Sequence, residues 1–272
     1  MSGVQIQRLA DGRLHLQHGP IDLICQVWGD EAAAYDRGVA RFDGLLEELV
    51  AELPALRCEN AALSGPIARV MAQAAAPFRP AFITPMAAVA GAVAETVLAA
   101  MVGPAMRRGY VNNGGDIALY LRAGESLRCA IAGSEDRILV RSGDPVRGIA
   151  TSGWRGRSWS LGIADSVTVL AKTAAMADAA ATMIANAIDV AEHPGIARQP
   201  ACKLQADSDL GARLVTVGVG GLTDLDIATA LSRGEAYAQN LQTRGLIASA
   251  ALYLRNECRT VGALGLKEPV YA

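Results

Sequence analysis

The sequence has few aromatic residues, no paired cysteines and almost no net charge, and each shortage excludes a class of protein. Aromatic side chains make up 4% of the 272 residues. The five cysteines are an odd number without a C-x-x-C pair, which excludes a disulfide framework and a zinc knuckle. The net charge of −2 provides no overall field that would attract a polyanion or an anionic membrane. We therefore expect neither a nucleic-acid partner nor membrane association.

The sequence also lacks an export signal and a convincing membrane span. Residues 1–20 contain no basic segment followed by an apolar one, which predicts a reduced, cytoplasmic protein. The run Ala81–Gly103 is long enough to cross a bilayer, but Pro85 interrupts it and Glu95 lies near its middle. We expect this run to form a buried helix.

Apolar residues make up 51% of the chain and charged residues 19%, which is typical of a folded protein. We expect residues 1–272 to form a single domain, with two intertwined lobes as the alternative. Strand-like and helix-like segments are grouped in blocks, which predicts an α+β fold: an antiparallel sheet meander with packed helices. The expected strands are 4–6, 14–16, 21–28, 108–111, 117–121, 127–132, 138–141, 147–150, 166–171, 213–219 and 246–261. The expected helices are 31–53, 67–75, 86–101, 173–188 and 227–243, and the polar segment 192–209 is expected to be an exposed loop.

A glycine-rich turn is expected between two of these strands. It reads Asn112-Asn113-Gly114-Gly115-Asp116. Paired glycines permit positive φ angles and let a ligand approach the backbone closely. The turn is therefore a candidate ligand site, with an ordinary hairpin turn as the alternative.

A second candidate ligand site follows the strand that ends near residue 150. Thr151-Ser152-Gly153 offers hydroxyl groups and backbone amides that suit a phosphate, although a hydroxyl-stabilised turn explains the same residues. The next six residues, 154–159, contain two tryptophans and the arginines Arg155 and Arg157. Arginine pairs with phosphate and tryptophan covers aromatic rings, so this loop could bind an anionic aromatic ligand. A surface loop anchored by tryptophan is the alternative.

A candidate metal site lies on the helix predicted at 173–188. Asp178 and Thr182 are four residues apart, so the carboxylate and the hydroxyl share one helix face. Mg²⁺ takes one or two protein carboxylates and completes its octahedron with water and phosphate oxygens. A surface aspartate beside a threonine bonded to its own helix is the alternative.

These segments, together with Ser166–Ala171 leading into the Asp178 helix, resemble the ApbE-like superfamily over about 70 residues, and in particular an uncharacterised, shorter branch of it. Members of known activity are flavin transferases that use magnesium to move FMN from FAD onto a threonine of a partner protein. The resemblance implies that Asp178 and Thr182 match the metal-binding D-x-x-x-T motif. It also implies that the 113–116 and 151–153 turns form the walls of the flavin-nucleotide site.

Two motifs of the transferases are missing. A histidine followed by D-P-x-T-G is replaced by residues 154–162, and the lysine of the G-A-I-A-K-G helix is absent from residues 87–92. We therefore expect a protein that binds a small anionic or nucleotide ligand, a flavin or a related compound, with Mg²⁺ but without efficient transfer. The alternatives are an authentic Mg²⁺-dependent transferase and a sulfur-handling protein whose reactive thiol would be Cys202 rather than a buried Cys129. A homo-oligomer is possible, and the sequence does not determine the oligomeric state.

Overall fold

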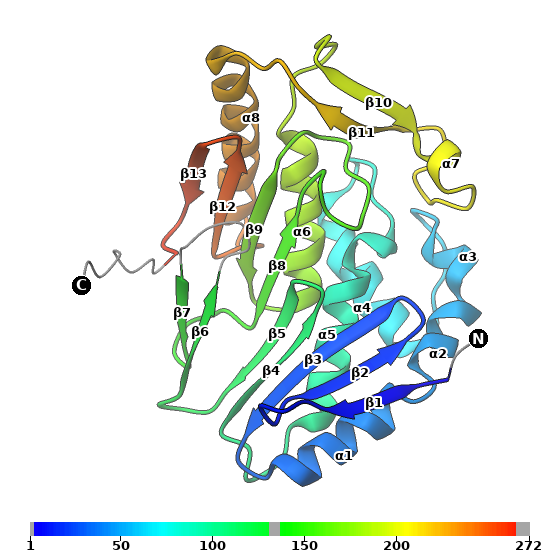
Figure 1. The fold of residues 1–272 in the computed structure, drawn as a ribbon, viewed down its shortest axis with the longest axis vertical. Helices are drawn as coiled ribbons and strands as arrows, with labels where there is room; N and C mark the ends of the chain where they lie inside the picture. The colour runs from blue at the N-terminus through cyan, green and yellow to red at the C-terminus, as the bar shows by residue number, and fades with distance from the viewer. Residues whose placement is uncertain (1–2, 131–136, 265–272) are drawn as a thin grey trace.

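A nine-stranded antiparallel sheet runs through the computed structural model, which describes residues 3–130 and 137–264 (Figure 1). The order across the sheet is β1-β2-β3-β4-β5-β8-β9-β12-β13. The strands β6 and β7 form one separate hairpin and β10 and β11 form another. The strand bounds are β1 Gln5–Arg8, β2 Leu14–His18, β3 Ile21–Trp28, β4 Arg108–Asn113, β5 Asp116–Leu121, β6 Ser126–Ala130, β7 Arg137–Arg141, β8 Gly148–Ser152, β9 Ser166–Ala171, β10 Ile196–Pro200, β11 Leu214–Val219, β12 Ser249–Leu254 and β13 Glu257–Val261. The expected α+β class is confirmed.

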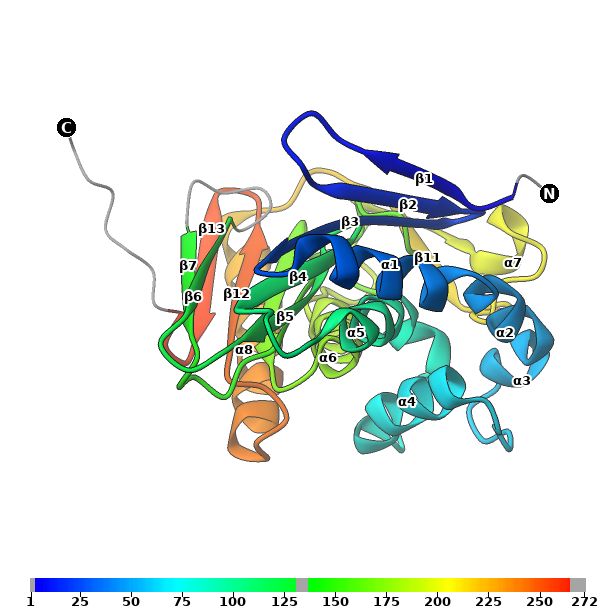
Figure 2. The same ribbon diagram turned by 90° about the horizontal axis from the view of Figure 1, so that it is seen from below.

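Helices cover one face of this sheet, with α5 and α6 packed side by side behind its centre (Figure 2). The helices are α1 Glu31–Phe42, α2 Leu45–Ala51, α3 Leu53–Leu56, α4 Pro66–Ala75, α5 Val89–Met101, α6 Ala174–Ala187, α7 Ala201–Leu204 and α8 Asp224–Thr243, with 3₁₀ turns η1 Ala76–Phe78 and η2 Pro85–Ala88. The side chain of Thr173 caps α6 by accepting from the Met176 amide at 3.2 Å. A capping box of Thr223 and Asp226 begins α8. Within the described residues, none of the helices has the length and apolar character that crossing a membrane requires.

The alternation of β3 explains how the sheet divides its side chains between two faces. Cys25 and Val27 are buried in the main core beneath the helices. Trp28, which points the opposite way, packs against a second apolar cluster that the β6–β7 hairpin covers. The sheet therefore presents a helix-covered face and a face that is only partly covered, and each carries a cavity.

Two expected segments differ from the structure. The helix expected over 31–53 is divided into α1 and α2, because the chain turns at Asp43 and at Gly44, whose φ is +78°, and α3 begins at Leu53. The apolar residues keep their helical spacing across this break, so the sequence pattern does not reveal it. The loop expected over 192–209 contains β10, which pairs antiparallel with the next strand, β11, and the short helix α7 between these two strands.

Candidate functional site

Two carboxylates approach each other where the start of β5 meets α6. Asp116 Oδ1 accepts a hydrogen bond from the Thr151 amide at 3.2 Å, and Asp178 Oδ2 accepts one from the Gly91 amide at 3.0 Å. Gly91 allows this contact because α5 and α6 touch there: a Cβ on Gly91 would lie 2.2 Å from the Ala174 carbonyl oxygen. The packing of the two helices therefore fixes the position of Asp178.

Both carboxylates are held where a negative charge is unfavourable. Burial raises the pKa of Asp116 to about 7, while the Thr151 amide and the Arg157 charge oppose this rise. Burial, and then the charge of Asp116, raise the pKa of Asp178 well above its ordinary value. Each side chain nevertheless keeps part of its surface open to the adjoining cavity. Two such acids favour a shared proton or a bound cation.

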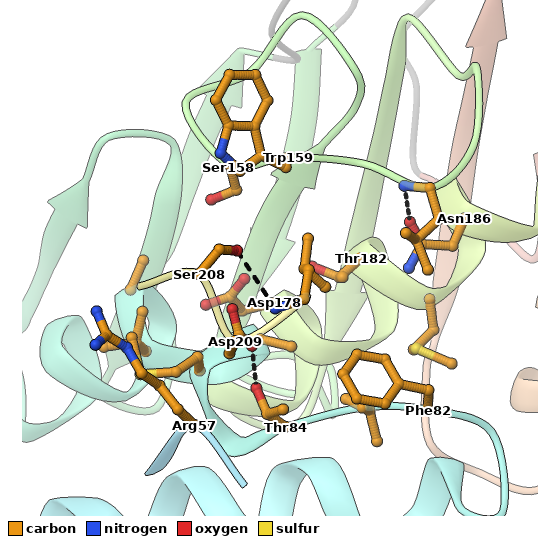
Figure 3. A pocket seen from close by; sticks show the side chains of 18 of the residues that line it. Arg57, Phe82, Thr84, Ser158, Trp159, Asp178, Thr182, Asn186, Ser208 and Asp209 are labelled. Atoms are coloured by element: carbon orange, nitrogen blue, oxygen red, sulfur yellow. Dashed lines mark hydrogen bonds between the residues drawn. The ribbon is translucent and has the colours of Figure 1, made fainter. Parts of the chain in front are cut away.

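The cavity beside this pair, which we call the carboxylate pocket, has a volume of about 260 Å³ (Figure 3). Asp178, Thr182 and Asn186 follow one another along α6 at intervals of four residues and line one wall. Phe82 and Trp159 provide aromatic surface at two sides of the pocket. Other polar lining residues are Arg57, Thr84, Asp116, Arg157, Ser158, Gln205, Ser208 and Asp209.

The glycine turn brings a guanidinium group to this pocket. Gly114 and Gly115 have φ angles of +64° and +117°, as the paired glycines predict. A Cβ on Gly114 would lie 1.7 Å from Nη2 of Arg157, whereas a Cβ on Gly115 would meet nothing within 4 Å. Gly114 is therefore the position that admits Arg157, and Gly115 serves the backbone conformation of the turn.

The loop of residues 154–159 divides into an anchoring half and a pocket half. The Trp154 indole donates to Asp165 Oδ1 at 3.0 Å, and Arg155 pairs with the same carboxylate at 3.3 Å while lying 5.0 Å from the Trp154 ring centroid. Arg157 and Trp159 line the carboxylate pocket instead. The surface-anchor interpretation thus describes the first half of the loop, and the ligand-site interpretation remains open for the second.

The remaining predicted site residues surround the pocket without lining it, among the residues that the structure describes. Asn113 donates its amide to the Ala90 carbonyl at 3.2 Å, which ties the turn to the start of α5. The Thr151 hydroxyl lies 2.9 Å from the Thr168 hydroxyl. Ser152 ends β8, and Gly153 packs against the Asp165 carbonyl. This segment positions Asp116, so four of the eleven predicted residues reach the cavity itself: Asp116, Arg157, Asp178 and Thr182.

Sequence reasoning missed the wall formed by distant segments. Asp209, in the stretch after α7, pairs with the buried Thr84 hydroxyl. Nearby, Arg57 at the end of α3 forms an ion pair with Asp207 at 2.7 Å. Arg57 and Asp209 do not belong to a local sequence motif, so only the tertiary fold brings them to the pocket.

The cysteines differ in how far their side chains are exposed. Cys25, Cys58, Cys129 and Cys202 are free thiols. Cys202 is exposed on the short helix α7, as a reactive thiol would require. Cys129, expected to be buried, is only partly buried, and its surroundings raise its pKa to about 11. At neutral pH Cys129 is therefore a neutral thiol.

Comparison with known proteins gives a family and a set of uncharacterised relatives. The model of the family described as "AbpE bacteria" matches residues 6–260. A UPF0280 protein from Methanothermobacter thermautotrophicus is 43% identical over 129 residues, which cover 44% of this chain and 47% of that protein. Another, from Methanopyrus kandleri, is 42% identical over 125 residues, covering 44% and 48%. The chain thus spans about half the length of the curated relatives it matches. The apo form of a flavinyl transferase ApbE from Pseudomonas stutzeri aligns over 96% of both chains, with 12% identity and a TM-score of 0.42.

Proposed function

The chain belongs to the family described as AbpE bacteria, and from this premise we propose that it binds a phosphate-bearing ligand, a flavin nucleotide or a related compound, together with Mg²⁺ in the carboxylate pocket. The observation that carries the proposal is the pair Asp116 and Asp178, two buried acids facing a cavity beside the guanidinium of Arg157.

The donor set of the pocket fits magnesium. Asp116, Asp178 and Thr182 offer only oxygen atoms, which Mg²⁺ prefers. In residues 3–130 and 137–264 no group of three or more acidic, histidine or cysteine side chains could hold a metal, so water and ligand phosphate would complete the octahedron. When bound, the ion would neutralise the two carboxylates and polarise a phosphate group.

The other lining residues have separate tasks in this proposal. Arg157 attracts the phosphate, since its guanidinium stays charged at every physiological pH. Trp159 and Phe82 offer flat apolar surface to an aromatic ring. The Arg213 guanidinium lies over the face of the Phe82 ring, 3.2 Å from its centroid, and steadies that ring.

Calorimetric titration with FAD tests the binding proposal. We expect FAD to bind in the presence of Mg²⁺ and to bind weakly after the metal is removed with EDTA. Asp178→Asn keeps an oxygen that can accept from the Gly91 amide but removes the charge, so it should weaken Mg²⁺-dependent binding by at least about tenfold. Asp36→Asn, on the exposed side of α1, is the matched control and should bind normally. Metal-independent binding that survives Asp178→Asn would refute the proposal.

Transfer of FMN is a separate step, and we propose that it is slow in this protein. Arg157 occupies the interval in which the transferases keep a histidine, and it cannot accept a proton near neutral pH. A positioned base typically contributes about 10²- to 10⁴-fold. Incubation with FAD, Mg²⁺ and a threonine-bearing acceptor peptide, followed by mass spectrometry, should therefore show little adduct. Abundant adduct that persists in Arg157→Ala would instead support an authentic transferase.

A further inference from the structure

A second cleft, with a volume of about 600 Å³, lies on the sheet face opposite the main helix layer. Its floor is made by side chains that face each other across paired strands: Trp28 of β3 stands opposite Arg108 of β4, and Gln26 stands opposite Tyr110. Strand β6 of the small hairpin forms the other wall. The alternation of β4 therefore sends Asn113 toward the helices and Asn112 toward this cleft.

Arg108 is fixed in this cleft and has one unused donor. Its guanidinium carbon lies 4.5 Å from the Trp28 ring centroid, and Nη1 donates to the Ser126 carbonyl at 2.9 Å. Its Nε is buried and has no hydrogen-bond partner among residues 3–130 and 137–264. A buried N–H without an acceptor is unfavourable, so these residues do not fully satisfy the side chain of Arg108. The side chain is already oriented, and little conformational entropy remains to be lost on binding.

The charge of Arg108 is only partly compensated. Glu125 lies 3.6 Å from Arg108 but also 3.5 Å from Arg107, so one carboxylate is shared by two guanidinium groups. Arg128 adds a further positive charge at the rim. Among the described residues that line the cleft, no side chain is acidic. The cleft therefore favours an anion.

The remaining surface is aromatic and rich in amide donors. The rings of Trp28 and Tyr110 lie 6.3 Å apart at 50°, and both line the cleft. Tyr110 donates its hydroxyl to Gln26 Oε1 at 3.3 Å, which leaves the Gln26 amide nitrogen as a donor. Asn112 Oδ1 accepts from the Gly115 amide at 2.8 Å, which likewise leaves the Asn112 nitrogen. A planar ring with an acceptor group at its edge matches this arrangement.

We propose that this cleft is a second ligand site, which binds a small planar aromatic carboxylate with its ring against Trp28 and Tyr110 and its carboxylate on the partly exposed guanidinium of Arg108. The cavity volume lies in the range of small-molecule sites, about 300 to 1,000 Å³. The site is independent of the carboxylate pocket, because the two cavities have no lining residue in common.

Titration of the full chain with 2-naphthoate and with its neutral analogue 2-naphthamide tests the proposal. The naphthoate should bind saturably and at least about tenfold more tightly than the amide, because both offer an acceptor oxygen but only the anion compensates the charge of Arg108. Arg108→Gln should reduce naphthoate affinity by at least about tenfold and abolish the preference for the anion. Arg69→Gln, an exposed arginine on α4 that lines neither cavity, is the matched control and should bind like the wild type.

Two further variants keep the test decisive. If Arg108→Gln fails to fold, Gln26→Leu serves in its place, since it removes an amide donor from the partly exposed floor and should weaken naphthoate binding. Arg157→Ala should leave naphthoate binding unchanged. Loss of binding in Arg157→Ala would place the probe in the carboxylate pocket and overturn the proposal, and so would equal binding of naphthoate and naphthamide or unchanged binding by a folded Arg108→Gln variant.

Discussion

Replacing Asp116 with asparagine should make the metal-free protein more stable above neutral pH while removing its response to Mg²⁺. Burial raises the pKa of this carboxyl from 3.8 to about 7. Between these two values the folded state holds a proton that the unfolded state has released, so the free energy of unfolding falls as the pH rises through about 7. The rise in pKa corresponds to at most about 4 kcal/mol lost by the charged form.

Asparagine removes this penalty and keeps an oxygen that can accept from the Thr151 amide. At about pH 8 the variant should gain roughly 2 kcal/mol or more, which is a rise in melting temperature of at least about 4 °C for a chain of this size. At about pH 4 the carboxyl is protonated in the folded wild type, so the two proteins should melt together. Mg²⁺ should raise the melting temperature of the wild type at the higher pH but not that of Asp116→Asn.

Thermal unfolding followed by circular dichroism at both pH values, with Mg²⁺ or EDTA, measures all of these effects. Asp36→Asn is the control, because loss of an exposed carboxylate changes stability by about 0.5 kcal/mol or less. A lower melting temperature for Asp116→Asn above neutral pH would show that the charged carboxylate stabilises the fold, and would refute the reasoning. An equal response of variant and wild type to Mg²⁺ would remove Asp116 from the metal site.

Two further pairs of variants test the local geometry. Gly114→Ala and Gly115→Ala should each lower stability by about 1 to 2 kcal/mol, because both positions have a positive φ. Gly114→Ala should in addition displace the Arg157 guanidinium and weaken FAD binding, whereas Gly115→Ala, whose Cβ has open space, should leave the affinity of the folded protein unchanged; equal affinities for the two variants would contradict the close approach of Arg157. Thr223→Ala should cost about 1 kcal/mol of stability in urea unfolding because it removes the cap of α8, and Thr223→Ser should restore it; if serine fails to restore stability, the capping hydroxyl is not the cause.

Local patterns predicted two of the elements that carry the carboxylate pocket, the helix α6 and the β4–β5 hairpin. The i, i+4 spacing places Asp178 and Thr182 on one face of α6, and both line the pocket. The turn formers at 112–116 predict the β4–β5 hairpin and its positive φ angles. The pattern could not show how deeply Asp178 is buried. Asp178 lies against α5, because Gly91 lets α5 and α6 touch. The alternative of a surface aspartate is therefore not what the structure shows.

Contacts between distant segments were beyond sequence reasoning. The six residues 154–159 contain two equivalent arginines, and only the fold directs Arg155 to Asp165 and Arg157 to the turn. Thr84 and Asp209 meet because the stretch after α7 folds back over the start of α5. The hydrophobic periodicity within either segment does not predict a contact with the other segment.

Three departures from ordinary folding rules meet at one cavity. Buried carboxylates normally carry a neutralising partner, yet burial raises the pKa of both Asp116 and Asp178. The guanidinium of Arg157 lies over a position where any side chain would collide with it. The aromatic ring of Trp159 is exposed, although the chain has few aromatic residues. The first feature lowers stability and the third lowers solubility. A bound anion with its cation would offset the first, pair with the guanidinium of Arg157 and cover the ring, so their convergence favours a ligand site over a structural accident.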